Sequence, residues 1–264
     1  MQKIAIISDI HGNLPALQAV LKDINTVYKA DQIYCLGDLT DGAPWHNEVI
    51  ELIQELNIPT IMGNHDERIA FDYAVHALSK HSLEEQDARL KTINHTKETI
   101  RHDNKQFLSG LVPDIRLDYD NLSCLLVHGS PRSNEEYIYE DHDESLLIQM
   151  FDETNSDVII TGHTHLSFIR SISTHDRKDK LFINAGSLGR TKEKNGGRAV
   201  YLRLTINETG EVNDIQKRVD ATLCEIDYSI HEVISGIKES EVPNFYAYFW
   251  EKHLQYPPRS QSYS

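Results

Sequence analysis

Three features are scarce or missing in this sequence, and each absence excludes a class of protein. The 264 residues include three cysteines and no C-x-x-C pair, so neither a disulfide framework nor a thiolate zinc knuckle is expected. No apolar run approaches the roughly 18–20 residues of a membrane span, and the N-terminus has no secretory leader pattern. No G-x-x-x-x-G-K loop is present, which excludes a P-loop kinase or NTPase. We therefore expect a cytoplasmic protein without membrane association.

Positive charge is also in short supply, because 26 lysines and arginines face 41 aspartates and glutamates, giving a net charge of −15. Proteins that bind nucleic acid neutralise its phosphates with basic side chains, so no stable nucleic-acid binding is expected. A small anionic substrate would need a local source of positive charge, and a metal centre is one such source. The sequence gives no indication of an oligomeric state.

The first 65 residues alternate short apolar runs with amphipathic stretches. Strands are predicted at 3–8, 32–37 and 59–62, and leucines and isoleucines at helical spacing predict helices over 13–28 and 44–56. Alternating strands and helices indicate an α/β fold built from layers.

Beyond residue 65 the pattern changes. Residues 66–110 are mostly polar and predict two or three helices, which form an insert or lid after the third strand. The later predicted elements are strands at 122–128, 157–161 and 181–185, a helix at 144–154, and a hairpin within 197–220 about a Glu-Thr-Gly turn. We expect one domain over 1–220, and a helical extension over 221–264 that packs on it and has a disordered end.

Each of five predicted strands is followed by side chains that bind metals. These are Asp9 and His11, then Asp38, then Asn64, His65 and Asp66, then His128, and finally His163 and His165. In open α/β sheets ligands bind at the carboxyl ends of the strands, so these side chains should converge. Burying carboxylates and imidazoles together without an ion would be costly. A mixed Asp, His and Asn set without thiolates suits Mn²⁺, Fe or Zn²⁺, and its size predicts two ions that share a carboxylate.

The same blocks, "SDIHGN", "GDLTDG", "GNHDE", "VHGSPR" and "GHTH", occur in this order between residues 8 and 165. Together they resemble the signature of the calcineurin-like metallophosphoesterases. "HGSPR" and "NAGSLG" resemble a bacterial branch that includes enzymes similar to diadenosine-tetraphosphate hydrolases. The resemblance implies a four-layer α/β/β/α sandwich and an enzyme that hydrolyses phosphoesters.

The resemblance also implies a role for each residue. Asp9, His11, Asp38 and His165 would hold one ion, and Asp38 would bridge to a second ion held also by Asn64, His128 and His163. His65 would act on the substrate without binding metal, and Asp66 would orient it. The ions would be Mn²⁺ or Fe, with Zn²⁺ or Ni²⁺ as alternatives, and would activate a bridging hydroxide for in-line attack on phosphorus.

Several assignments around the centre have two interpretations. Arg132 and Asn184, with Asn64, are predicted to contact substrate, although Arg132 could equally be a surface residue. Asp41 either caps the following helix or takes an acidic position seen in relatives. Tyr137 and Tyr139 either stack on a nucleobase or pack locally. The glycines that accompany the ligands are predicted to adopt positive φ angles; they are Gly12, Gly37, Gly63 and Gly162.

The predicted function is hydrolysis of phosphodiester or phosphoanhydride bonds in a small molecule, with dinucleoside polyphosphates among the candidates. The high negative charge, with Arg132 as the only extra cation near the motifs, argues against a monoester dianion. The alternatives are a broad-specificity phosphomonoesterase and a non-catalytic metal-binding scaffold of the same fold. A scaffold would be expected to lose ligands, and this chain keeps all of them. The H-x-H-x-D-H motif of metallo-β-lactamases fails after His165.

Overall fold

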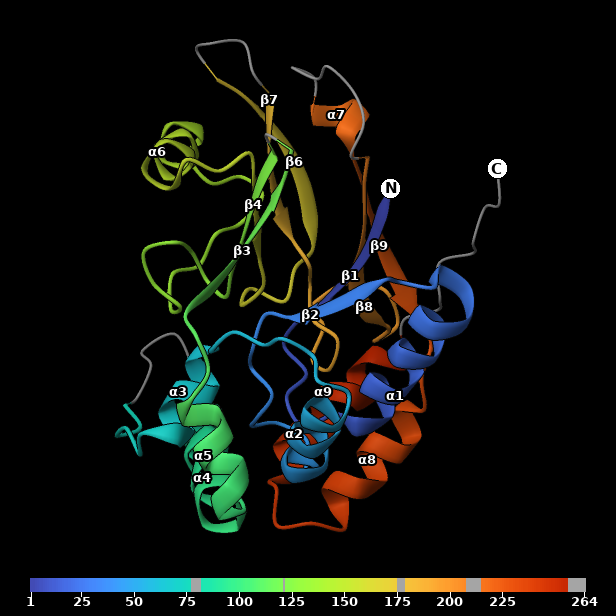
Figure 1. The fold of residues 1–264 in the computed structure, drawn as a ribbon. Coiled ribbons are helices and arrows are strands. Elements are labelled where there is room, and N and C mark those ends of the chain that lie inside the picture. Colours follow the sequence, from blue (N-terminus) through green and yellow to red (C-terminus); the bar gives the residue numbers. More distant parts are fainter. Residues whose placement is uncertain (77–81, 121, 175–178, 208–214, 256–264) are drawn as a thin grey trace.

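The computed structural model describes residues 1–76, 82–120, 122–174, 179–207 and 215–255, and its centre is a pair of β-sheets (Figure 1). One sheet has the strand order β2-β1-β8-β9. Its strands are β1 (Gln2–Ile7), β2 (Gln32–Cys35), β8 (Ala199–Ile206) and β9 (Val219–Ile226). The other sheet has the order β3-β4-β5-β7-β6. Its strands are β3 (Asp114–Tyr119), β4 (Leu122–Val127), β5 (Val158–Thr161), β6 (Phe168–Ser173) and β7 (Asp179–Asn184).

The two sheets pack face to face through alternate residues of their strands. Ile4 and Ile6 of β1 share an apolar cluster with Leu126 of β4, whereas Ala5 and Ile7 point to the opposite face and contact helices. A strand that is covered on both faces needs apolar residues at consecutive positions, which explains the unbroken apolar run near the N-terminus.

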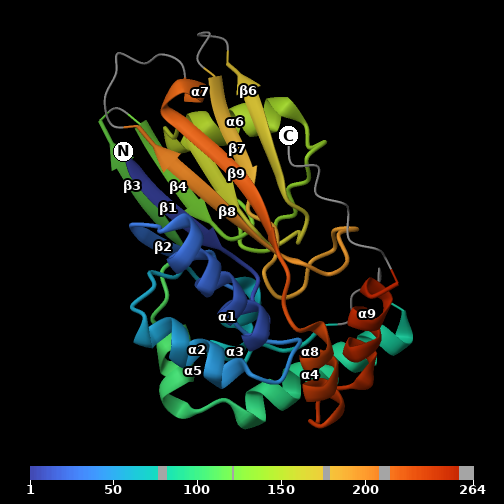
Figure 2. The same cartoon turned by 90° about the vertical axis from the view of Figure 1, so that its right-hand side faces the viewer.

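Helices cover the outer face of each sheet (Figures 1 and 2). On the four-stranded sheet lie α1 (Leu14–Asp23), the π-helical turn η1 (Ile24–Tyr28) and α2 (His46–Glu55). On the five-stranded sheet, α6 (Glu144–Thr154) packs Leu147 and Phe151 against Phe182 of β7. The predicted four-layer α/β/β/α sandwich is confirmed.

Two further groups of helices lie at one end of the sandwich (Figure 2). The segment after residue 63 forms α3 (Asn64–Ala70), α4 (Leu83–Thr99) and α5 (His102–Ser109), and the C-terminal part forms α8 (Ile230–Lys238) and α9 (Asn244–His253). Ala88 of α4 and Trp250 of α9 belong to one apolar cluster. The insert and the C-terminal helices are therefore neighbours, although about half of the sequence separates them.

Some predicted elements need correction. Residues 59–62 form only isolated bridges, Thr60 with Cys35 and Ile61 with Val112, because the segment is short and Pro59 has no N–H to donate. The edge strands β3 and β6 were not predicted, since each exposes polar residues that weaken the apolar pattern.

The predicted hairpin is present, but its second strand comes later in the sequence. It is β9, which follows the short α7 (Ile215–Arg218) and pairs antiparallel with β8. Residues 221–226 are thus extended, and the C-terminal helices begin only at Ile230. The predicted Glu-Thr-Gly turn and the predicted disordered end both lie outside the described residues. In the described part of the chain, no helix combines the length and apolar character required to span a membrane.

Candidate metal centre and the cavity beside it

Seven buried side chains meet at the carboxyl ends of the strands, each at most 8% exposed. They come from the loops after β1, β2, β4 and β5 and from the first residue of α3, and they are Asp9, His11, Asp38, Asn64, His128, His163 and His165. The structure thus brings together every predicted metal ligand.

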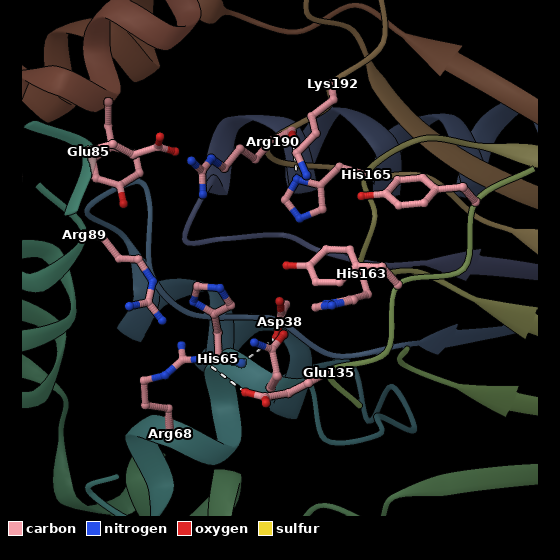
Figure 3. A pocket seen from close by; sticks show the side chains of 14 residues that line it. Asp38, His65, Arg68, Glu85, Arg89, Glu135, His163, His165, Arg190 and Lys192 are labelled. Atoms are coloured by element: carbon pink, nitrogen blue, oxygen red, sulfur yellow. Dashed lines mark hydrogen bonds and ion pairs between the residues drawn. The ribbon is translucent and has the colours of Figure 1, made fainter. Parts of the chain in front are cut away.

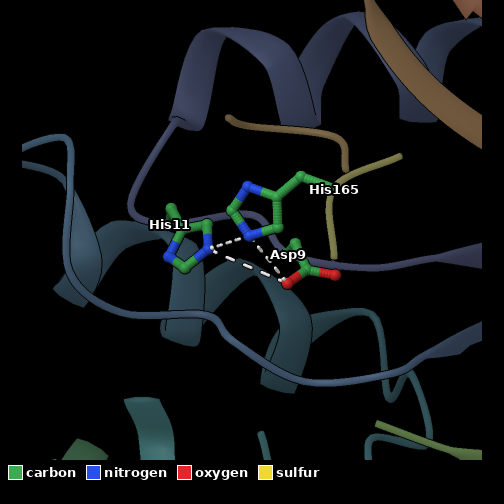
Figure 4. A group of neighbouring side chains, drawn as sticks. All are labelled: Asp9, His11 and His165. Carbon is green, nitrogen blue, oxygen red and sulfur yellow. Dashed lines mark hydrogen bonds and ion pairs between the residues drawn. The ribbon is translucent and has the colours of Figure 1, made fainter. Parts of the chain in front are cut away.

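The first group of donors is formed by Asp9, His11 and His165 (Figure 4). The Nε2 atoms of the two imidazoles are 3.0 Å apart, and His165 Nε2 lies 3.1 Å from Asp9 Oδ1. The Nδ1 atom of His11 lies 3.0 Å from the Thr40 carbonyl oxygen, and that of His165 lies 2.7 Å from the Arg190 carbonyl oxygen. A carbonyl only accepts, so Nδ1 carries the proton and Nε2 presents a lone pair. Three acceptors therefore face one another, an arrangement that calls for a cation.

The second group is formed by Asp38, His128 and His163. His128 Nε2 lies 3.4 Å from Asp38 Oδ2 and 3.2 Å from Asn64 Oδ1, while His128 Nδ1 donates to the Leu36 carbonyl at 2.7 Å. In the described ranges of the chain, the buried Nε2 atom of His163 finds no hydrogen-bond partner. Asp38 Oδ2 is also 3.8 Å from His11 Nε2, so Asp38 lies between the two groups.

Burial and charge set the protonation of these imidazoles. Burial lowers the pKa of His11 and of His163 to about 3, which keeps both neutral and able to bind a metal. Burial also opposes a charge on His128, but the Asp38 carboxylate outweighs it and raises the pKa of His128 to about 10. A metal ion bound to His128 and Asp38 would displace this proton and balance the charge of the Asp38 carboxylate in its place. The donor set therefore fits a metal centre.

The backbone of five of the seven ligands is left-handed. The φ angles are 53° at Asp9, 50° at His11, 54° at Asp38, 64° at His163 and 62° at His165. Residues with a side chain rarely adopt this region, and they persist there only when the surrounding structure holds them. The loops thus place strain at the residues that carry the chemistry.

The glycines beside the ligands have two different roles. Gly12 and Gly37 adopt the predicted positive φ. The same prediction is wrong for Gly63 and Gly162, which are not in the left-handed region. A Cβ atom on Gly162 would lie 2.5 Å from Asp9 Oδ2, and one on Gly63 would lie 2.2 Å from Asp38 Oδ1. These two glycines are needed because the ligands pass so close.

His65 lies beside the cluster, with its side chain 18% exposed. Its backbone N–H donates to Asp38 Oδ1 at 2.8 Å, and its Nδ1 atom lies 2.8 Å from Asp41 Oδ2. Burial alone would raise the pKa of Asp41, but the bond to His65 and its charge lower it. Asp41 is not a helix cap, because α2 begins at His46 with Trp45 as N-cap residue.

Asp66 does not orient His65, contrary to the prediction. Its Oδ1 atom accepts from the backbone N–H groups of Leu39 at 2.9 Å and Thr40 at 3.3 Å, and so it braces the loop that carries Asp38. Burial, and then the nearby Asp38 charge, raise the pKa of Asp66 to about 7. Asp41, from the same loop as Asp38, takes the orienting position.

The cluster forms one side of a cavity of about 420 Å³ (Figure 3). Tyr137 packs its ring 4.1 Å from that of His163, and the Tyr139 ring stacks on Tyr137 at 6.1 Å. Both tyrosines line the cavity while packing locally. The other lining residues include Arg68, Glu85, Arg89, Glu135, Arg190, Lys192 and Tyr246.

Two predicted substrate contacts are corrected by this geometry. Arg132 forms an ion pair with Glu136 and does not line the cavity. Asn184 is fully buried, and its Nδ2 atom donates to the Gly162 carbonyl at 2.6 Å and to Thr164 Oγ1 at 3.0 Å. Asn184 therefore supports the loop that carries the two histidines and does not face substrate.

Sequence reasoning missed the basic residues of the cavity. Arg68 could have been predicted from the sequence, because it follows Asn64 by one helical turn and so lies on the same face of α3. No sequence pattern indicates Arg89, Arg190 or Lys192 as cavity residues, since only the tertiary structure brings their segments to the cluster.

Comparisons with known proteins agree with this site. Residues 2–209 match the model of the calcineurin-like phosphoesterase superfamily domain. The chain is 28% identical over 254 residues to the uncharacterized protein MJ0912 of Methanocaldococcus jannaschii, covering 92% of this chain and 94% of the relative.

Two solved structures share the fold over almost the whole chain. A metallophosphoesterase from Sphaerobacter thermophilus is 24% identical with a TM-score of 0.71, covering 96% of this chain and 99% of that one. The hypothetical protein PH1004 from Pyrococcus horikoshii OT3 is 20% identical with a TM-score of 0.76, covering 95% and 98%. Because the family match spans most of the sequence and the ligand groups stand where the family's blocks meet, the chain belongs to the calcineurin-like phosphoesterase superfamily and is a metallophosphoesterase, a hydrolase.

Proposed function

We propose that this enzyme uses two transition-metal ions to hydrolyse phosphodiester or phosphoanhydride bonds in a small anionic molecule. The observation that carries the proposal is that the donors gather in two groups, Asp9 with His11 and His165 and Asp38 with His128 and His163, while a third group of His11, Asp38 and His65 links them. Seven protein ligands are more than a single transition-metal ion coordinates, whereas two ions that share a carboxylate would use all of them. Mn²⁺ and Fe suit this oxygen and imidazole set best, with Zn²⁺ or Ni²⁺ as alternatives.

The first ion would be held by Asp9, His11 and His165, the second by Asn64, His128 and His163, with Asp38 shared between them. When bound, the ions would supply Lewis acidity to the attacking water and to the phosphoryl oxygens. The protein's own contribution is to hold the ligands rigidly, since backbone carbonyls orient the imidazoles of His11, His128 and His165.

His65 is the residue best placed to give a proton to the leaving oxygen. Asp41 fixes its Nδ1 atom at 2.8 Å, so the opposite ring nitrogen is available to the cavity that His65 lines. General acid catalysis requires a positioned imidazole whose orientation is held by a carboxylate. The pair of His65 and Asp41 meets that requirement, and its backbone bond to Asp38 ties it to the metal ligands.

The charge of the cavity favours a phosphoanhydride over a simple diester. The chain as a whole carries −15, but four basic residues line the cavity, namely Arg68, Arg89, Arg190 and Lys192. The net charge argues against a highly charged substrate, but these basic residues supply positive charge at the place where the substrate would bind. A simple diester has one negative charge, so it complements a cavity with several basic side chains less well than a phosphoanhydride does.

The test is a metal-reconstitution assay with three substrates. Metal-depleted protein is loaded with Mn²⁺, Fe²⁺, Zn²⁺ or Ni²⁺ and assayed on bis-p-nitrophenyl phosphate, p-nitrophenyl phosphate and diadenosine tetraphosphate. We expect activity to require close to two equivalents of metal, and kcat/KM to be higher for the diester or the anhydride than for the monoester. A monoester advantage of about tenfold or more would overturn the substrate class. A stoichiometry that stays at one would overturn the two-ion centre.

A further inference from the structure

We propose that Arg68, Arg89 and Arg190 form an anion subsite that binds a non-reacting phosphate of the substrate. This inference rests on the proposed function, in which the reacting phosphate lies at the metal cluster. It narrows the substrate class to phosphoanhydrides and other small molecules that carry at least two phosphates. The subsite also gives the insert and the C-terminal helices a role in choosing the substrate.

Arg68 is a buried cation without a full set of partners. The residue is 7% exposed, and its buried Nη1 atom has no hydrogen-bond partner among the residues that the structure describes. The carboxylate paired with it, Glu135, is 3.8 Å from Nη2 and has a side chain that is 69% exposed. A buried guanidinium with an unsatisfied donor is costly, and an anion in the cavity would satisfy it.

Arg89 reaches the same place from α4. Its Nη1 atom donates to the carbonyl oxygen of His76 at 3.0 Å, which uses one of the five N–H donors of a guanidinium. Burial, and then the positive charge of Arg68, lower the pKa of Arg89. Two guanidinium groups that repel each other would both be stabilised by one anion, and a phosphate accepts paired hydrogen bonds from such groups.

Arg190 is held in position by aromatic rings of the C-terminal helix. Its guanidinium carbon lies 5.0 Å from the centre of the Tyr246 ring and 5.5 Å from that of Phe249. Within the described part of the chain, its buried Nε atom has no hydrogen-bond partner. Both rings belong to α9, which lies beyond the residues 2–209 that the family domain covers. The subsite is therefore completed by a part of this chain outside the family domain.

The arrangement in space supports a substrate that bridges the two sides. In Figure 3, Arg68, Arg89 and Arg190 lie on one side of the cavity and His163 and His165 on the other. Glu85 and Glu135 are the carboxylates that line the cavity apart from Asp38, so the four basic residues there outnumber them. A polyphosphate chain would place one phosphate at the metal ligands and the next toward the arginines.

The first experiment uses a series of dinucleoside polyphosphates, diadenosine di-, tri- and tetraphosphate, that differ only in the number of phosphates. Bis-p-nitrophenyl phosphate, which has different ends, serves as a separate reference with a single phosphate. For the unaltered enzyme we expect kcat/KM to rise about tenfold or more along the series. Arg89→Gln and Arg190→Gln should each reduce that rise by about tenfold, because a charged donor to phosphate is lost.

A matched control is Arg101→Gln, because Arg101 forms an exposed ion pair with Glu51 and does not line the cavity. It should leave the dependence on phosphate number unchanged. An equal loss on all four substrates in the cavity variants, or a flat series in the unaltered enzyme, would overturn the subsite.

The second experiment measures binding without turnover. Titration calorimetry of inorganic tripolyphosphate into metal-depleted protein should give a single site, weakened about tenfold by Arg89→Gln and not by Arg101→Gln. Absence of binding, or equal affinity in both variants, would contradict the proposal. If the proposed function fails, tripolyphosphate still binds through the arginines but no substrate is hydrolysed. If only the subsite fails, hydrolysis persists without any dependence on phosphate number.

Discussion

The two sides of the cavity are built by different means. The metal side consists of short side chains on loops after strands, with a left-handed backbone and imidazoles oriented by carbonyl groups. The basic side consists of long arginine side chains on α3, on α4 and on the loop at Arg190, supported by the rings of α9. Main-chain geometry therefore fixes the reaction site, while side chains from helices shape the part that would recognise the remainder of the substrate. The five changes below test this division.

The largest effect is expected at the carboxylate between the two donor groups. Asp38→Ala should remove metal from both groups and lower kcat more than about 10³-fold, beyond the effect of losing a single electrostatic donor. Elemental analysis and a steady-state assay of the same preparation measure the two quantities. Asp118→Ala, an exposed position on β3, is the matched control. Retention of two ions in the Asp38 variant would rule out its shared role.

His65→Ala should lower kcat by about 10²–10⁴-fold, the range of a lost general acid, while both ions remain bound. The reason is that Asp41 holds His65 Nδ1 and that the Asp9 group and the Asp38 group each contain two other histidines, although His65 also lies within 4.8 Å of His11 and Asp38 as a third possible donor group. Metal content measured alongside kcat decides between the two roles, since loss of one ion would make His65 a ligand.

Asp41→Asn should have a smaller effect, about tenfold in kcat, because the amide keeps the contact with His65 Nδ1 but loses the carboxylate charge beside it. KM should change little, since Asp41 does not line the cavity. The double variant with His65→Ala should be no worse than His65→Ala alone. Additive losses would mean that Asp41 acts independently of His65.

Replacing the ring that holds Arg190 should act mainly on substrate affinity. Tyr246→Leu removes a cation–π contact of about 0.5–2 kcal/mol, so KM for a polyphosphate substrate should rise while kcat on bis-p-nitrophenyl phosphate stays within about twofold. Tyr246→Phe keeps the ring and should restore the affinity. If Tyr246→Phe and Tyr246→Leu are equally impaired, the hydroxyl and not the ring is responsible.

The smallest effect is expected for Arg132→Gln. Arg132 pairs with Glu136 on the protein surface, and exposed ion pairs contribute about 0–1 kcal/mol. Activity on all substrates should therefore stay within about twofold, measured as kcat/KM. A marked rise in KM would mean that Arg132 contacts the substrate, and the two sides of the cavity would then differ less than described.

Much of the metal side could be predicted because it follows from local rules. An apolar strand followed directly by Asp or His delivers that side chain to the sheet edge, so Asp9, Asp38 and His163 were identified from spacing alone. The prediction that Asp66 orients His65 was wrong because these two neighbours in the sequence point in different directions. Asp66 follows His65 directly, but adjacent residues on a helix do not face each other, and Asp41 occupies the orienting position.

The basic side could not be predicted for a related reason. Arg89 and Arg190 reach the cavity only because α4 packs against α9 and because the rings of α9 lie under the Arg190 side chain. Nothing in either local sequence marks these arginines as different from surface residues. Asn184 is an error of the opposite kind, because it was predicted to contact substrate from its motif. Its amide instead donates hydrogen bonds to the loop beside it.

The distance along the chain between the metal-site residues has a consequence for biosynthesis. The N–H of His163 donates to Asp9 Oδ2, and His11 contacts His165, each across 154 positions. A nascent chain that has emerged only as far as β4 thus holds Asp9, His11 and Asp38 without their partners. Contacts of this range form late in folding, because a long loop must first close. We therefore expect the donor groups to be completed, and metal to be held firmly, only after the loop that carries His163 and His165 has left the ribosome.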